Sequence, residues 1–339
     1  MKTLILFLIY VIFTQNSITI AQSKIEEPNT EALAAILLDA ETGRVLWEKN
    51  GYKELPMAST TKIMTLLIAL ENGNLEDIVT VSSKAASQPK VRMNLKKGEE
   101  IKLEHLLYAL MLNSFNDAAV AIAEHISGTV EEFTNLMTER AKEFGAYNTS
   151  FKTPSGLDAD GHFSTAFDMA IITKEALKNE DLVNIITTET WQASSTKNTY
   201  SLVNKNRLLY EVEGAYGVKT GFTGKAGHCF VGSVKKDNFN FITVVLGSGH
   251  FGNRNQKWKD TKAILKYGFE NFTLKEIWDE ISIPILESDV VEIFEEKSVV
   301  KLYVNNKLEM LVYRNDYIEI EAEDVEEKNF FDDLLDIFE

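Results

Sequence analysis

The amino-acid sequence predicts an α+β fold, in which one antiparallel sheet is assembled from both ends of residues 30–272 and helices pack on it. Two observations predict this: strand patterns occur over residues 32–50 and again from about Val218, and helical periodicity dominates between them. The chain has 339 residues and is 45% hydrophobic, so it can bury one large core or two unequal ones and is too apolar to be disordered.

The start of the chain has the features of a secretory signal. Lys2 precedes an apolar run from Leu4 to Phe13, and Thr19-Ile20-Ala21 offers a small-residue cleavage site. The run is shorter than the roughly 17 residues that a membrane-spanning helix needs. We therefore expect a signal peptide over residues 1–21 and an exported mature protein that begins near Gln22; an uncleaved anchor is the alternative.

The next elements are a hairpin and a helix. Residues 32–50 predict two strands joined at Asp39–Gly43, where Asp and Gly supply the turn chemistry. Residues 59–72 predict the opening helix, with Ser59 as its N-cap and Gly73 just past its end.

The middle of the chain is predicted to be mostly helical. Residues 103–127 carry helical periodicity that is interrupted at "NSFND". A further helix opens with Thr129 and Glu132 at capping-box spacing and closes at Gly145.

Strand patterns return in "GVKTGFT", "HCFVGSV" and "FITVVLGSG", and Lys235–Asn238 forms the turn between the last two. Cys229 is the only cysteine, so no internal disulfide can form, and its apolar surroundings predict a packing thiol. Residues 257–272 return to helix, which completes the main domain over residues 22–273.

A small all-β module is expected over residues 274–325, followed by an acidic amphipathic tail over residues 326–339. The stretches "VVEIF", "VVKLYV", "LEMLVY" and "YIEIEA" alternate apolar and charged residues, with Asn305-Asn306 at a turn.

The formal charge of −16 is concentrated in this last part of the chain. Residues 275–339 contain 20 acidic and 6 basic residues, a net −14, which leaves −2 for the preceding 274. No basic stripe is present to neutralise phosphates, so nucleic acid is not expected as a partner.

Ser59 and Lys62 are the first candidate catalytic residues. In a helix, residues three apart lie on one face about 5 to 6 Å apart, so the Lys62 amine can reach the Ser59 hydroxyl. A neutral lysine can serve as a base for a serine nucleophile, and a helix N-terminus favours an oxyanion. The spacing alone also fits a capping serine beside a surface lysine, so further motifs are needed.

Two further elements add to this pair. Ser114 and Asn116 lie in the break at "NSFND", where a hydroxyl and an amide can project into a cleft or merely cap a turn. Lys219-Thr220-Gly221 opens a strand, so alternation aims Lys219 and Gly221 to one side and Thr220 to the other, with the bare Gly221 leaving room for a ligand. This edge suits a substrate carboxylate, although edge lysines also protect sheets from aggregation.

In combination, these elements resemble the set shared by penicillin-binding proteins and class A β-lactamases. The stretches "STTKIMT", "NSFNDAA", "STAFDMA", "NKNRLL" and "GVKTGFTGKAGHC" look like the low-molecular-weight penicillin-binding proteins, the serine-type D-alanyl-D-alanine carboxypeptidases of the peptidase S11 family. The resemblance covers about residues 30–272, and more weakly the later β module. It implies a penicillin-binding-protein/β-lactamase-like transpeptidase fold and no cofactor.

The resemblance also implies a reaction and a role for each residue. Ser59 attacks the bond between two terminal D-alanines of a peptidoglycan stem peptide and forms an acyl-enzyme, which water releases. By the same resemblance Lys62 is the base, Ser114 a proton relay to the leaving amine, and Asn116 a ligand for the substrate amide. Lys219 and Thr220 hold the terminal carboxylate, and the N–H groups of Ser59 and Phe222 form the oxyanion hole. Lys219 near Lys62 would lower the pKa of that lysine.

Two departures from the family pattern concern the ligand and the membrane. Some relatives carry His where this chain has Phe222, which keeps the backbone donor but removes a side-chain contact, so the substrate preference stays open. Relatives often end in a basic amphipathic helix, whereas the apolar face over Phe330–Phe338 is opposed by an acidic face that an anionic bilayer should repel. Membrane attachment is therefore not predicted, and a monomer is expected.

Two other functions are weighed. A β-lactamase would need a Glu for deacylation, but "EALKN" at residues 175–179 has helical periodicity and lacks the Glu-x-x-Leu-Asn pattern. A non-catalytic envelope binding protein would not need Ser59, Lys62, Ser114 and Lys219 together.

The five histidines lack paired ligand spacing for a metal, and His162 and His228 fit either the cleft or packing roles.

Overall fold

The computed structural model describes residues 27–236, 239–249 and 252–272, together with the backbone of three later strands. These are β10 (Val291–Glu296), β11 (Val299–Val304) and β12 (Lys307–Tyr313), which form an antiparallel sheet as expected for the β module. The signal peptide expected over residues 1–21, the strand expected near residues 317–322 and the tail expected over residues 326–339 lie outside the described residues.

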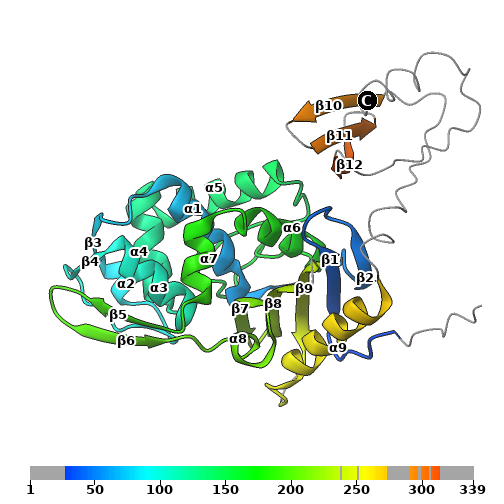
Figure 1. The fold of residues 1–339 in the computed structure, drawn as a ribbon. Coiled ribbons are helices and arrows are strands. Elements are labelled where there is room, and N and C mark those ends of the chain that lie inside the picture. Colours follow the sequence, from blue (N-terminus) through cyan, green and yellow to red (C-terminus); the bar gives the residue numbers. More distant parts are fainter. Residues whose placement is uncertain are drawn as a thin grey trace, which may run out of the picture.

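A five-stranded antiparallel sheet joins the two ends of the main domain (Figure 1). Its order is β2-β1-β9-β8-β7, so β1 of the N-terminal hairpin pairs with β9, the last strand of the main domain. The strands are β1 (Ala34–Asp39), β2 (Val45–Lys49), β7 (Ala215–Thr223), β8 (Gly227–Lys236) and β9 (Phe239–Ser248). The predicted α+β fold with a sheet built from both ends is confirmed.

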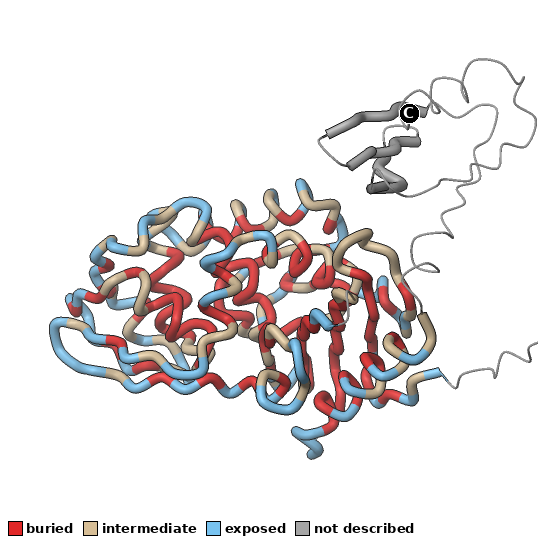
Figure 2. The backbone as a smooth tube through the Cα atoms, in the orientation of Figure 1, coloured by how far each residue is buried: buried red, intermediate tan, exposed pale blue. Residues whose placement is uncertain are grey.

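The two faces of the sheet serve different cores, because neighbouring residues of a strand point to opposite faces. In β1, Ile36 and Leu38 belong to the large core shared with the helices of the other half, whereas Leu37 packs with Trp258 and Leu265 of α9 (Gln256–Asn271). Figure 2 shows buried backbone running through the strands of this sheet and into the helical half.

The helical half lies between β2 and β7 in sequence, as expected. Its longer helices are α1 (Lys62–Asn72), α3 (Leu103–Leu112), α4 (Asn116–Ser127), α5 (Val130–Glu143), α6 (Ala166–Ala176) and α7 (Glu180–Thr187). Short elements are η1 (Ala58–Thr61), α2 (Ser83–Ala86), α8 (Leu208–Glu211), the pair β3 (Ile78–Thr80) and β4 (Glu100–Lys102), and the hairpin β5 (Thr190–Ser194) and β6 (Thr199–Val203). The break at "NSFND" separates α3 from α4, and the Thr129 side chain caps α5 by accepting from the Glu132 N–H.

The N-cap prediction for Ser59 is wrong. Ser59 lies inside η1, a 3₁₀ turn that precedes α1, and Thr61 occupies the N-cap position of the helix. The hydroxyl of Ser59 is engaged with more distant groups, Lys62 Nζ and the Ser155 carbonyl, and so does not cap the helix. Gly73 does follow the end of α1 as predicted.

Across the described residues, no helix combines the length and apolar character that crossing a membrane requires.

Candidate active site

The turn that carries Ser59 is held from both sides. Inside the turn, Thr60 Oγ1 donates to the Met57 carbonyl at 2.6 Å and Thr61 Oγ1 donates to the Ala58 carbonyl at 2.8 Å. Two glycines let other segments approach its backbone: a Cβ at Gly156 would lie 1.9 Å from the Ala58 oxygen, and one at Gly221 would lie 2.9 Å from the Ser59 nitrogen. Ser59 is therefore presented by a tightly packed turn.

Lys62 lies one turn further on, with its side chain completely buried. Its Nζ is 2.9 Å from Ser59 Oγ, 3.0 Å from Asn116 Oδ1 and 2.5 Å from the Ser155 carbonyl oxygen. A neutral amine has two N–H groups and one lone pair. Asn116 Oδ1 and the Ser155 carbonyl oxygen can accept hydrogen bonds from the two N–H groups. The lone pair of Lys62 Nζ is then free to accept the proton of the Ser59 hydroxyl.

The surroundings of Lys62 favour this neutral form. The pKa of Lys62 is held well below 10.5, chiefly because burial penalises the ammonium and also because Lys219 is close; Asp117 opposes the shift. The Asp117 carboxylate accepts hydrogen bonds from the Met93 and Leu95 N–H groups at 2.8 and 3.1 Å.

Lys219 is also buried, behind the wall of the pocket. Burial, aided by the charges of Lys257 and Lys205, lowers the pKa of Lys219 to about 7. Its Nζ donates to the Thr220 carbonyl at 3.1 Å. The prediction that Lys219 would depress the pKa of Lys62 agrees with this arrangement.

The expectation for Gly221 needs a correction. β7 is an edge strand of the sheet, and Thr220 lines the pocket on the side opposite to Lys219, as alternation predicted. The space above the Gly221 Cα, however, is occupied by the backbone of η1 and is not left open for a ligand. Gly221 is needed because the strand and the turn of Ser59 are in direct contact.

Ser114 reaches the site from the break between α3 and α4, and Asn116 reaches it from the first position of α4. Ser114 lines the pocket and has a left-handed backbone with φ of 62°, an uncommon conformation for a residue with a side chain. Asn116 is buried and donates from Nδ2 to the Pro89 carbonyl at 3.3 Å, while its Oδ1 accepts from Lys62. Asn116 therefore orients the base.

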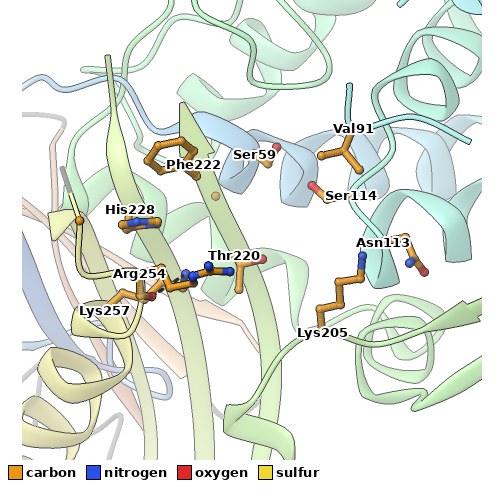
Figure 3. Close-up of a pocket in the computed structure, with 12 residues that line it drawn as sticks. Ser59, Val91, Asn113, Ser114, Lys205, Thr220, Phe222, His228, Arg254 and Lys257 are labelled. Atoms are coloured by element: carbon orange, nitrogen blue, oxygen red, sulfur yellow. Dashed lines mark hydrogen bonds between the residues drawn. The ribbon is translucent and has the colours of Figure 1, made fainter. Parts of the chain in front are cut away.

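A pocket of about 650 Å³ opens over Ser59 (Figure 3). It is lined by Ser59, Val91, Asn113, Ser114, Lys205, Thr220, Gly221, Phe222, His228, Gly252, Arg254 and Lys257. Three of these side chains are cations and none is a carboxylate, so the pocket suits an anionic ligand.

Sequence reasoning missed the cations of the pocket and the Ser155 carbonyl. Arg254 and Lys257 lie near the start of α9, and only the pairing of β8 and β9 brings that segment to β7. Lys205 belongs to "NKNRLL", a stretch that was recognised as similar to the family but from which no role for the lysine was inferred. A main-chain carbonyl such as that of Ser155 leaves no signal in the sequence.

The two histidines near family-like segments have different positions. His162 is buried under η1: its Nδ1 accepts from the Lys152 N–H at 2.9 Å, so its Nε2–H is assigned as donor to Thr61 Oγ1 at 3.0 Å. Burial lowers the pKa of His162 to about 4, which keeps the ring neutral. His228 lines the pocket, with its ring centroid 4.5 Å from that of Phe222.

Cys229 is fully buried, and burial raises the pKa of its thiol to about 12, in agreement with a packing role. Among the described residues, no group of three or more His, Cys, Asp and Glu side chains could hold a metal ion.

The fold and the site together define a class of protein: a penicillin-binding-protein fold that carries a buried serine–lysine pair under a cationic pocket. The chain belongs to the D-alanyl-D-alanine carboxypeptidase family, whose model matches residues 21–250.

Curated relatives and solved structures agree with this assignment. The chain is 42% identical over 248 residues to D-alanyl-D-alanine carboxypeptidase DacF of Bacillus subtilis, covering 71% of this chain and 63% of DacF. It is 35% identical over 264 residues to DacC of Escherichia coli, covering 74% of this chain and 64% of DacC. The alignments thus span less than two thirds of either relative.

The fold is similar to that of the D-alanyl-D-alanine carboxypeptidase from Mycobacterium tuberculosis, with a TM-score of 0.70 and 27% identity over 75% of this chain and 96% of that one. It is also similar to a mutant Streptomyces DD-transpeptidase, with a TM-score of 0.68 and 28% identity over 72% of this chain and all of that one.

Proposed function

We propose that this protein is a serine-type D-alanyl-D-alanine carboxypeptidase, which removes the terminal D-alanine from peptidoglycan stem pentapeptides through an acyl-enzyme on Ser59. The observation that carries the proposal is the contact of 2.9 Å between Ser59 Oγ and the buried Nζ of Lys62. A neutral lysine at this place can take the serine proton as the hydroxyl attacks.

Acylation begins when Ser59 Oγ attacks the carbonyl carbon of the penultimate D-alanine and its proton passes to Lys62 Nζ. Negative charge then develops on the carbonyl oxygen. The N–H groups of Ser59 and Phe222 stabilise this oxyanion. The close approach of Gly221 to the Ser59 nitrogen supports this assignment, because it brings β7 and η1 to the same point.

The leaving group is the terminal D-alanine. Ser114, which lines the same pocket, relays a proton to the leaving amine as the C–N bond breaks. Thr220 binds the terminal carboxylate directly, and the buried charge of Lys219 adds a positive field from behind the wall. Asn116 keeps the Lys62 amine oriented and contributes to binding of the substrate amide. Water then hydrolyses the acyl-enzyme and frees Ser59.

The same pocket accepts β-lactam antibiotics, which acylate Ser59 in place of the peptide.

We place the protein outside the cytoplasmic membrane, after signal cleavage, as a monomer that acts in cell-wall synthesis, remodelling and cell shape. The signal-like residues 1–21 support export. The net charge of −16 and the lack of a basic stripe in the sequence support the absence of a nucleic-acid partner.

The β-lactamase alternative is not favoured. Glu175 lies in α6, where its carboxylate pairs with Lys178 at 2.7 Å, and it is not among the residues that line the pocket. The non-catalytic alternative does not explain why Lys62 is buried against Ser59 with its pKa lowered.

Release of free D-alanine from a synthetic stem peptide that ends in D-Ala-D-Ala tests the proposal. We expect release by the mature protein, loss of release in Ser59→Ala, and full release in Ser83→Ala, a control at an exposed serine of α2. No release by the unmodified protein would contradict the proposal. Penicillin turnover would then separate a lactamase from a binding protein.

A further inference from the structure

Two large apolar side chains are exposed at the mouth of the pocket. Phe222 is 59% exposed and Val91 is 51% exposed. Single exposed apolar residues are common on protein surfaces. Among the large apolar side chains that are exposed in the described part of the chain, however, only these two line the pocket. Apolar walls with few polar groups are typical of ligand sites.

The ring of Phe222 and the backbone of Val91 are each held by a neighbouring residue. Phe222 follows Thr220 on the same side of β7, and one face of its ring packs on His228 with centroids 4.5 Å apart. The Val91 carbonyl accepts from the Asn116 N–H at 2.8 Å, which ties Val91 to the first turn of α4. Phe222 thus belongs to the sheet wall and Val91 to the helical wall.

The pocket is divided by polarity (Figure 3). Phe222 and Val91 lie on either side of Ser59 in this view, whereas Arg254, Lys257, Thr220 and Lys205 lie toward the other end. A peptide whose terminal carboxylate is drawn to the cationic end therefore has its acyl part pass Ser59 toward the apolar end.

We propose that Phe222 and Val91 form an acyl-side subsite, which holds the methylene chain of the residue that precedes the two D-alanines. This inference rests on the proposed function. The ligand class is a side chain that is long and aliphatic with a polar end, since Phe222 and Val91 offer apolar contact along a chain whose polar end can remain in water. Phe222 is then a specificity-determining residue, beyond the backbone donor that its N–H supplies.

Two peptides that differ only in this side chain test the subsite. We compare Nα,Nε-diacetyl-L-lysyl-D-Ala-D-Ala with N-acetyl-glycyl-D-Ala-D-Ala and measure kcat/KM for D-alanine release. In Phe222→Ala we expect the ratio of kcat/KM on the lysyl peptide to kcat/KM on the glycyl peptide to fall about five- to tenfold, as removal of roughly 50 Å² of apolar contact implies. The loss should lie mainly in KM.

Conservative variants and a control sharpen the comparison. Phe222→Leu should recover most of the lysyl activity, and Val91→Thr, which keeps the shape, should lose about twofold on the lysyl peptide alone. Tyr147→Ala removes an aromatic ring that is 71% exposed outside the pocket, and it should leave both substrates unchanged.

Equal losses on both peptides in Phe222→Ala and Val91→Thr would overturn the subsite while leaving the carboxypeptidase function intact. Failure of the unmodified protein to release D-alanine from either peptide would instead overturn the proposed function, and the subsite with it. Thermal unfolding of each variant identifies a folding defect; if Phe222→Ala unfolds, Phe222→Leu and Val91→Thr decide the question by their ratio of lysyl to glycyl activity.

Discussion

Lys62 differs from an ordinary lysine in that its whole side chain is inside the protein. Burial of an ammonium is costly, and here burial and the nearby Lys219 outweigh the opposing influence of Asp117, so the pKa of Lys62 falls and the neutral amine is favoured. Its spacing from Ser59 could be predicted from sequence, because residues three apart share a helix face. The carbonyl of Ser155 and the amide of Asn116, which complete the geometry, are 93 and 54 residues away from Lys62 and could not be predicted by helix geometry.

The titration of Lys219 gives a prediction at the same scale. An ammonium is charged below its pKa, so raising the pH through about 7 removes the charge of Lys219. We expect the pH profile of kcat/KM for D-alanine release to have a basic limb near this pH, that is, kcat/KM should fall as the pH rises through it. The reason is that loss of the Lys219 charge weakens the field that attracts the substrate carboxylate. His228 does not explain such a limb, since its pKa is lowered below 6.5 by burial and by Lys257 and Arg254.

Lys219→Arg keeps the charge to higher pH, so the limb should move upward by more than about one pH unit. Lys178→Met, at a lysine paired with Glu175 outside the pocket, should leave the limb in place. A limb that stays near pH 7 in Lys219→Arg would show that Lys219 is not its source.

At the scale of elements, the turn η1 depends on the space that glycines leave around it. Gly156 has φ of +82°, and a Cβ there would meet the Ala58 oxygen at 1.9 Å. Gly98 offers a matched control, since its φ is +71° but a Cβ there would have no atom within 4 Å. An added side chain would therefore strain the backbone at both positions, but only at Gly156 would its Cβ also collide with another segment.

We expect Gly98→Ala to lower the free energy of unfolding by about 1 kcal/mol and Gly156→Ala by about 3 kcal/mol. Gly156→Ala should also slow acylation of Ser59 more than about tenfold, because the turn must shift and a small misplacement of the nucleophile is expensive. Urea unfolding and penicillin acylation rates check both. Equal effects of the two substitutions would contradict a packing role for Gly156.

The elements with strong local signals were predicted correctly, among them the first hairpin, the break before α4 and the cap at Thr129. The turn η1 was missed because its form depends on contacts with Gly156, Gly221 and His162, which are distant in sequence. The hairpin of β5 and β6 was also missed, although Thr190–Val203 pairs residue by residue and its "TKN" turn is a local signal.

The whole molecule places its chemistry where the two ends of the main domain meet the helical half. Ser59 and Lys62 come from the helical side, whereas Thr220, Phe222 and Lys257 come from β7 and the start of α9 (Figures 1 and 3). The sheet from both ends could be predicted from the strand patterns. The cationic end of the pocket could not, because it depends on how β8 and β9 fold back on β7.

The role of Ser59 and Lys62 is tested most directly by mapping where benzylpenicillin attaches, by mass spectrometry of the intact protein and of its peptides. We expect one penicilloyl group per chain, on the peptide that contains Ser59, and no adduct in Ser59→Ala. We also expect Lys62→Met to slow adduct formation by more than about a hundredfold, the usual contribution of a positioned base. An adduct on another residue, or an unchanged rate in Lys62→Met, would contradict the claim that the buried lysine activates Ser59.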